Sequence, residues 1–260
     1  MNSDSGPLDP DHQPDQMPDQ NPDALDAIRE DENRKDPGKK PIGEIFSRAY
    51  EIYRNNPLMI VPSLIPIAVI FVTLLTFVGY IGLVAVFGED GSVAFSVLAG
   101  LFMFVVLTIV LFFLAEGMTI EMVREASSGK KADLSSAWQA TSARMGPLVV
   151  TSFLAGIIVA LGYVFFFIPG LILSFAFYFV AQAVMIDDKS GTQALKASYR
   201  FVEANLSDAL VVVLVSLAIG AILPGIPLIG PLICLLSLPY VYGLATLLYL
   251  DERDGNSGPK

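Results

Sequence analysis

The sequence predicts an all-α integral membrane protein with six transmembrane helices and both termini in the cytosol. Three observations predict this fold class. Apolar residues make up 53% of the 260 positions, and charged residues make up only 16%. The chain contains six apolar stretches, and a helix needs about 20 such residues to cross ~30 Å of hydrocarbon. Lysine and arginine occur only in alternate connections between these stretches.

All sixteen lysine and arginine residues therefore fall on one side of the predicted spans. Seven precede the first stretch, four lie between the second and third, three lie between the fourth and fifth, and two follow the last. The connections near 88–92, 169–170 and 224–231 contain none. Because cationic loops beside spans are retained in the cytosol, we expect a multi-pass protein of the cell membrane.

The chain opens with an acidic tail at residues 1–40. It repeats Pro-Asp every four residues from Pro10-Asp11 to Pro22-Asp23 and carries eleven acids against five bases. So few apolar residues predict disorder, either as a solvating tail or as a tether for a partner. The net charge of −10 argues against nucleic acid as a partner and suits a high-salt cytosol.

The membrane domain is predicted at 41–252, followed by a short cytosolic tail at 253–260. Because lipid offers no hydrogen-bond partners, each span must be a helix. The six predicted spans are 57–87, 93–117, 147–168, 170–187, 207–224 and 229–250.

Within this domain the pattern predicts three repeats of an amphipathic interfacial helix followed by a helical hairpin. The first amphipathic helix places Ile45 and Ala49 on one face, the second begins at Asp133 as its N-cap, and the third begins near Thr192. We expect their apolar faces to lie against lipid. The residues predicted for this interface are Trp138, Arg48, Arg144 and Arg200.

Two local features should shape the hairpins. Pro169-Gly170 and Pro224-Gly225 predict tight turns outside the membrane, because Pro restricts one turn dihedral and Gly accepts a positive φ. Small residues at four-residue spacing, including Gly156 and Gly220, predict close contacts between helix backbones.

Few residues could carry chemistry within the membrane. Glu116 is the ionisable candidate, and Tyr178 with Gln182 could line a polar cavity or form interhelical hydrogen bonds. The only histidine, His12, is in the tail, and Cys234 is the only cysteine. The sequence therefore predicts no catalytic, cofactor or metal site, and we expect a chain that is not an enzyme.

One stretch of the sequence, preceded by Ile168-Pro169-Gly170 and a span, resembles the membrane domain attached to some glycerophosphodiester phosphodiesterases; it reads Asp187-Asp188-Lys189-Ser190-Gly191-Thr192-Gln193-Ala194-Leu195-Lys196-Ala197-Ser198. Asn56-Pro57-Leu58 at the start of the first span fits the same resemblance, which covers about residues 42–250. Taken together with the acidic composition, it implies a stand-alone archaeal relative of that domain. The phosphodiesterase activity is not implied, since the family's hydrolase domain is a separate soluble unit without a counterpart in this sequence.

The function expected from the sequence is the organisation of lipids or partner proteins in the membrane, with membrane lipids, a membrane-protein partner or a homo-oligomer as partners. A small-solute transporter or channel is the alternative, favoured by the internal repeats. A membrane enzyme that uses only hydroxyl or carboxylate groups is a third class. A water-filled cavity reaching mid-membrane would favour transport.

Overall fold

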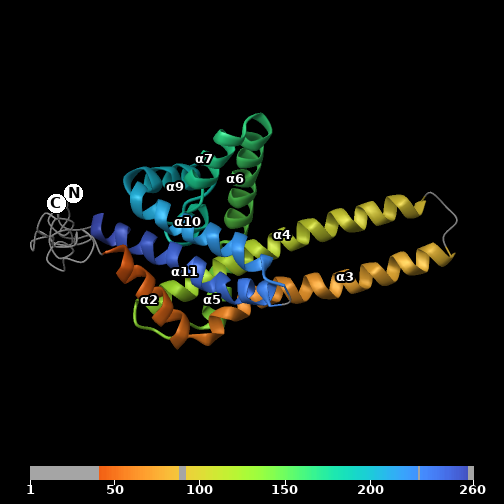
Figure 1. Cartoon of the computed structure of the whole chain (residues 1–260), viewed down its shortest axis with the longest axis horizontal. Helices are drawn as coiled ribbons and strands as arrows, with labels where there is room; N and C mark the ends of the chain where they lie inside the picture. Colours follow the sequence, from red (N-terminus) through yellow and green to blue (C-terminus); the bar gives the residue numbers. More distant parts are fainter. Residues whose placement is uncertain (1–40, 88–91, 228, 257–260) are drawn as a thin grey trace, which may run out of the picture. The chain divides into compact units, whose positions relative to one another are not determined.

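The computed structural model describes residues 41–87, 92–227 and 229–256, and within them it contains helices and loops without a strand. Three short helices, α2, α5 and α9, each precede longer apolar helices (Figure 1). In chain order the elements are α2 (Ile42–Asn55), η2 (Pro57–Ile60), α3 (Val61–Phe87), α4 (Ser92–Ser127), α5 (Leu134–Ala143), α6 (Met145–Phe165), α7 (Phe167–Ala176), α8 (Val180–Met185), α9 (Thr192–Ala204), α10 (Leu206–Ile222), η3 (Leu223–Gly225) and α11 (Gly230–Asn256).

Six helical segments in the described residues are long and apolar enough to cross a membrane, which confirms the predicted fold class. The threefold repeat and the cytosolic placement of the termini stay predictions. The acidic tail, the connection at 88–91 and the last four residues lie outside the described residues. The six segments are Pro57–Gly82, Phe95–Ser127, Met145–Phe165, Phe167–Met185, Leu206–Gly225 and Ile233–Arg253.

Two spans differ from their predicted form. The second was expected to end near residue 117, but α4 continues without interruption to Ser127 because residues such as Ile120 and Met122 are fully buried in protein. At 1.5 Å per residue its 36 residues extend about 54 Å, well beyond the hydrocarbon thickness. The fourth span is not one helix, since α7 ends at Ala176 and α8 begins at Val180.

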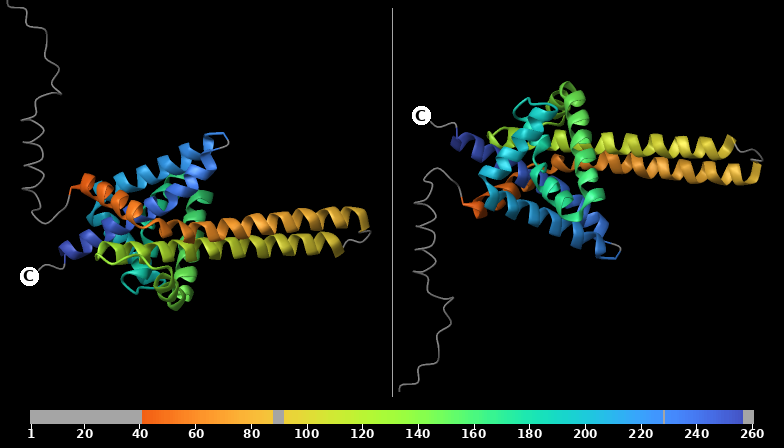
Figure 2. Two further views of the ribbon diagram at one scale, coloured as in Figure 1. Left: turned by 90° about the horizontal axis from the view of Figure 1, so that it is seen from below. Right: turned by 90° about the horizontal axis from the view of Figure 1, so that it is seen from above.

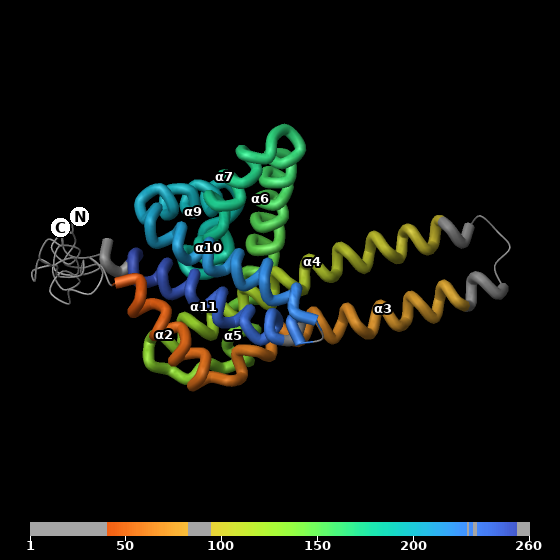
Figure 3. The backbone as a smooth tube through the Cα atoms, viewed as in Figure 1, coloured from red at the N-terminus to blue at the C-terminus, as the bar shows by residue number. Residues whose placement is uncertain are grey.

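The helical hairpins extend in different directions. Figures 1 and 2 show α3 and α4 side by side in a hairpin that reaches away from the other helices, and the α6–α7 hairpin runs across that direction. Figure 3 shows the third hairpin, in which α10 and α11 pack against each other. Only 6% of the most apolar window of Phe95–Ser127 is buried, against 50% for Ile233–Arg253. The α3–α4 hairpin therefore presents most of its apolar surface outward.

The hydrophobic core lies where the three short helices meet the ends of the spans. We call this the basal core: α2, α5, α8 and α9 together with residues 114–127 of α4, 206–213 of α10 and 244–253 of α11. Ile45 of α2, Ala137 of α5 and Ala194 of α9 are buried in it. We expected the apolar faces of the short helices to lie against lipid, whereas these positions pack against protein. Their burial removes apolar area from water without a membrane.

The first predicted turn is wrong. The chain reverses at Phe166, whose backbone is extended, whereas Pro169 and Gly170 lie inside α7. Pro169 is the third residue of that helix, where a missing N–H removes no intrahelical hydrogen bond. The second Pro-Gly pair does lie between two helices, in η3.

The close approaches of helix backbones also occur at other glycines than we predicted. A Cβ atom added at Gly156 or Gly220 would meet nothing within 4 Å, so their predicted packing role within the chain is wrong. A Cβ at Gly170 would lie 2.4 Å from the Tyr163 ring, and one at Gly117 would lie 2.7 Å from Leu148 Cδ2. The α6–α7 crossing and the base of α4 therefore exclude a side chain, and so does the start of α11, where a Cβ at Gly230 would lie 2.1 Å from the Leu223 carbonyl oxygen.

Candidate functional site

Polar side chains of the described residues gather in two places that could carry a function. The first is within the spans, around Glu116 and Tyr178, and the second is a basic pocket between α9 and α11. The two groups come from different elements and are described in turn.

The intramembrane group joins four elements. Glu116 of α4 interacts electrostatically with the hydroxyls of Tyr178, between α7 and α8, and of Tyr242 on α11. Tyr178 also lies near Ser216 of α10, whose hydroxyl donates to the Val212 carbonyl at 2.7 Å. The structure therefore brings together two of the three predicted intramembrane residues. The sequence analysis did not predict Tyr242 and Ser216 as members of this group. The one signal in the sequence was the presence of a tyrosine, Tyr242, within the last span.

Gln182, the third predicted residue, is 1% exposed within α8. Its backbone carbonyl accepts a hydrogen bond from Ile186, but no described residue donates one to its side-chain Oε1. The predicted interhelical hydrogen bond to this oxygen is therefore missing from the described residues, whereas the alternative of a polar cavity stays a prediction. An amide oxygen buried in this way costs free energy until a donor reaches it.

The break in the fourth span is closed by a side chain from α9. Ser198 is fully buried; its Oγ donates a hydrogen bond to the Ala176 carbonyl at 2.7 Å and accepts one from the Phe179 amide at 3.2 Å. Neither backbone group has a hydrogen-bond partner within its own helix, because α7 ends and α8 begins at this point. Because a low-dielectric interior leaves no alternative partner, Ser198 makes the break tolerable and joins α9 to the fourth span.

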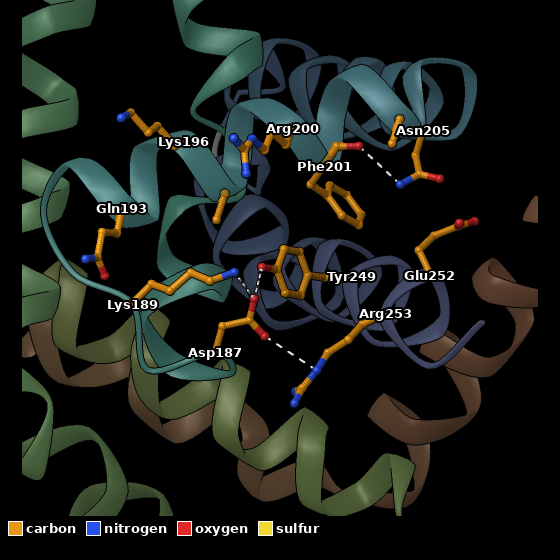
Figure 4. Close-up of a pocket in the computed structure, with 12 residues that line it drawn as sticks. Asp187, Lys189, Gln193, Lys196, Arg200, Phe201, Asn205, Tyr249, Glu252 and Arg253 are labelled. Carbon is orange, nitrogen blue, oxygen red and sulfur yellow. Dashed lines mark hydrogen bonds and ion pairs between the residues drawn. The ribbon is translucent and has the colours of Figure 1, made fainter. Parts of the chain in front are cut away.

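This junction positions the second site, a pocket of about 480 Å³ beside α9 and α11. Figure 4 shows the side chains that line it. Four cations and two acids line it, so its formal net charge is 4 − 2 = +2 in a chain whose total is −10. The cations are Lys189, Lys196, Arg200 and Arg253, and the acids are Asp187 and Glu252.

Asp187 is held at one wall of this pocket by three groups. Lys189 Nζ and the Tyr249 hydroxyl donate to Asp187 Oδ2 at 2.9 and 2.8 Å, and Arg253 Nε lies 3.5 Å from Oδ1 (Figure 4). The carboxylate is 15% exposed. Two cations and a phenol thus satisfy this acid, which leaves it little capacity to neutralise the other cations of the pocket.

An aromatic layer forms the apolar part of the site. The rings of Phe201 and Tyr249 have centroids 4.7 Å apart, and Phe179 packs on Phe201 at the same distance. Tilted aromatic contacts of this kind add to the burial of the rings themselves. They fix Tyr249, whose hydroxyl holds Asp187, against α9.

The arginines predicted for the interface have different surroundings. Arg48 of α2 pairs with Asp251 of α11 at 2.5 Å, and Arg144 pairs with Asp188. The Arg144 guanidinium, which donates a hydrogen bond to Asp188, holds the pKa of that carboxyl below its usual range. Arg200 makes no ion pair with any described residue and lines the pocket.

The remaining predicted interfacial residue, Trp138 of α5, is 50% exposed. That exposure leaves its ring accessible to lipid headgroups or to water. Over the ranges that the structure describes, no group of three or more His, Cys, Asp or Glu side chains could hold a metal ion. The positive charge of the basic pocket between α9 and α11 suits it to binding an anion.

One protein family matches this chain. The model of the family described as a domain of unknown function, DUF7847, matches residues 41–246, which include every helix of the basal core except the end of α11. No curated protein and no solved structure matches the chain. The match does not test the resemblance to the membrane domain of glycerophosphodiester phosphodiesterases, which stays a prediction.

Proposed function

The chain belongs to the DUF7847 family of unknown function, and from this premise we propose that it organises lipids or partner proteins in the cell membrane without being an enzyme. In this proposal the protein crosses the membrane six times, and the basal core lies at the cytosolic ends of the spans, on the side of both termini. The alternate distribution of lysine and arginine supports that orientation.

The observation that carries the proposal is the outward apolar surface of the α3–α4 hairpin. α3 packs mainly against α4 and leaves side chains such as Phe71, 62% exposed, uncovered. On α4, Phe102 is 70% exposed. An apolar surface of this length needs lipid or another membrane protein to cover it. The basal core provides a compact base from which the hairpin reaches into the bilayer.

A photo-crosslinking residue at Phe102, introduced in cell membranes, tests this role. We expect discrete adducts with a lipid class, a partner protein or a second copy. The same residue at the exposed Ser142 of α5, outside the spans, is the matched control and should give none of these adducts. Native mass spectrometry after mild detergent extraction should then show a stoichiometric companion. A bare chain, with no discrete adduct at Phe102, would contradict the proposal.

A small-solute transporter or channel is the second candidate, and the group around Glu116 favours it. Ionisable residues inside spans are costly and often mark solute or proton paths. Glu116, Tyr178 and Tyr242 come together from three elements of the described chain. Flux measurements in liposomes compare the wild type with Glu116→Gln; a flux that the substitution abolishes would replace the first proposal with the second.

A further inference from the structure

The pocket between α9 and α11 holds positive charge that the described protein leaves unneutralised. Asp187 is occupied by Lys189, Arg253 and the Tyr249 hydroxyl. Lys196 and Arg200 lie four residues apart on the same face of α9, and neither pairs with an acid of the described residues (Figure 4). Like charges at this spacing repel each other, so an anion between them would be favoured.

This arrangement is unusual among the predicted interfacial arginines. Arg48 and Arg144 each pair with an acid at or just after the end of a span, Asp251 and Asp188. Arg200 differs from both, because it makes no ion pair with a described residue and lines the basic pocket together with Lys196. Arg48 and Arg144 therefore stabilise the fold through their ion pairs. Arg200 has no such partner among the described residues, so its guanidinium can bind a ligand.

The location and chemistry of the pocket indicate what that ligand is. Lysine and arginine are the side chains that proteins use to bind phosphate oxygens, arginine with two parallel hydrogen bonds. The volume of about 480 Å³ is in the range of small-ligand sites, and Phe201 with Tyr249 gives the pocket an apolar wall. The pocket also lies at the ends of two spans, on α11 and just after α8, where headgroups would reach it if those ends meet the bilayer surface.

We propose that this pocket is a binding site for a phosphate ester, with Lys196 and Arg200 holding the phosphate oxygens. Asp187 is a positioning residue, because it fixes Lys189 and Arg253 at the wall of the pocket without touching the ligand. The same chemistry is present in the headgroup of an anionic phospholipid and in a soluble phosphate ester. The inference rests on the proposed function, since it names the lipid chemistry that the basal core would hold.

The test uses the full-length protein in detergent and native mass spectrometry with defined lipids. Phosphatidylglycerol and phosphatidylcholine are added in equal amounts, and retention of each is measured for the wild type and for Lys196→Gln/Arg200→Gln. Lys130→Gln/Lys131→Gln is the matched control, since these exposed lysines lie outside the pocket and lose the same charge. Arg200→Lys keeps the charge and serves as the conservative variant.

We expect the wild type to retain phosphatidylglycerol over phosphatidylcholine. The pocket variant should lose at least about tenfold in affinity, the effect of one charge-assisted hydrogen bond. The control pair should change it by less than about twofold, and Arg200→Lys should keep most of the binding. Equal melting temperatures of the variants will show that the fold is retained.

A second arm separates the two sources of phosphate. Inorganic phosphate and glycerol 3-phosphate are titrated against the lipid-bound protein. If a soluble ligand displaces the lipid from the wild type and does not bind the pocket variant, the site binds a soluble phosphate ester, which supports the proposal. If neither ligand displaces the lipid and the wild type still selects phosphatidylglycerol, the site binds the lipid headgroup. The proposal would be overturned if the wild type did not discriminate between the two lipids and bound neither soluble ligand. It would also be overturned if the control pair lost as much affinity for phosphatidylglycerol as the pocket variant. Adduct formation at Phe102 does not depend on this pocket, so that outcome would leave the proposed function standing.

Discussion

Replacing Ser198 by alanine tests how the protein tolerates a broken helix in its interior. The substitution removes one small hydroxyl from a fully buried position and leaves the Ala176 carbonyl and the Phe179 amide without their partner. Each buried backbone group left unsatisfied costs about 1–3 kcal/mol, so the two together should lower the free energy of unfolding by about 2–6 kcal/mol. For a domain of this size, about 2–4 °C per kcal/mol, that corresponds to a fall of roughly 4–24 °C in melting temperature.

Thermal unfolding in detergent, followed by circular dichroism, measures this change. Ser47→Ala is the matched control, because the Ser47 hydroxyl donates to the Gly43 carbonyl on an exposed helix surface. We expect the control to stay within about 0.5 kcal/mol of the wild type. If Ser198→Ala melts together with the control, the hydrogen bonds from α9 do not support the break, and the reasoning about the fourth span fails.

Other substitutions test the rest of the fold. Gly170→Ala should destabilise the α6–α7 hairpin by about 1–3 kcal/mol, since its Cβ would lie 2.4 Å from the Tyr163 ring. Gly156→Ala is the control and should be neutral or slightly stabilising, because a Cβ there meets open space. Equal melting temperatures of the two variants would refute the close approach at Gly170. Asp133→Ala should cost about 1 kcal/mol, because the carboxylate accepts a hydrogen bond from the Ser136 amide at 2.9 Å, and urea unfolding measures it. A double-mutant cycle with Arg48→Ala and Asp251→Ala should give a coupling of about 1 kcal/mol between α2 and α11, and a coupling near zero would show that the partly exposed pair does not join them.

Features that depend on one stretch of chain were predictable from the sequence. The six spans follow from runs of apolar residues, and Asp133 was recognised as an N-cap because a cap acts only on its own helix. The amphipathic pattern at Ile45 and Ala49 also located α2 correctly. What that pattern could not show is which apolar surface the helix covers, and the structure buries it in protein instead of lipid.

Features that depend on distant residues could not be predicted. The break near Phe177 carries neither Pro nor Gly and is stabilised by Ser198, about twenty residues further on. The basic pocket combines Lys196 of α9 with Arg253 of α11, which are far apart in the chain. Within the intramembrane group, Glu116 was recognisable because a carboxylate in a span is rare, whereas Tyr242 was not.

The central claim, a basal core at the cytosolic ends of six spans, is tested most directly by labelling single cysteines in intact cells and in opened membranes. In a Cys234→Ser background, cysteines are placed at the exposed Ser47, Ser142 and Thr192 of the three short helices and at Phe166 and Ile226 between the hairpin helices. We predict that a membrane-impermeant reagent labels the first three only after the membrane is opened, and labels the last two in intact cells. Labelling of any short helix in intact cells, or protection of Phe166 and Ile226 there, would contradict the account.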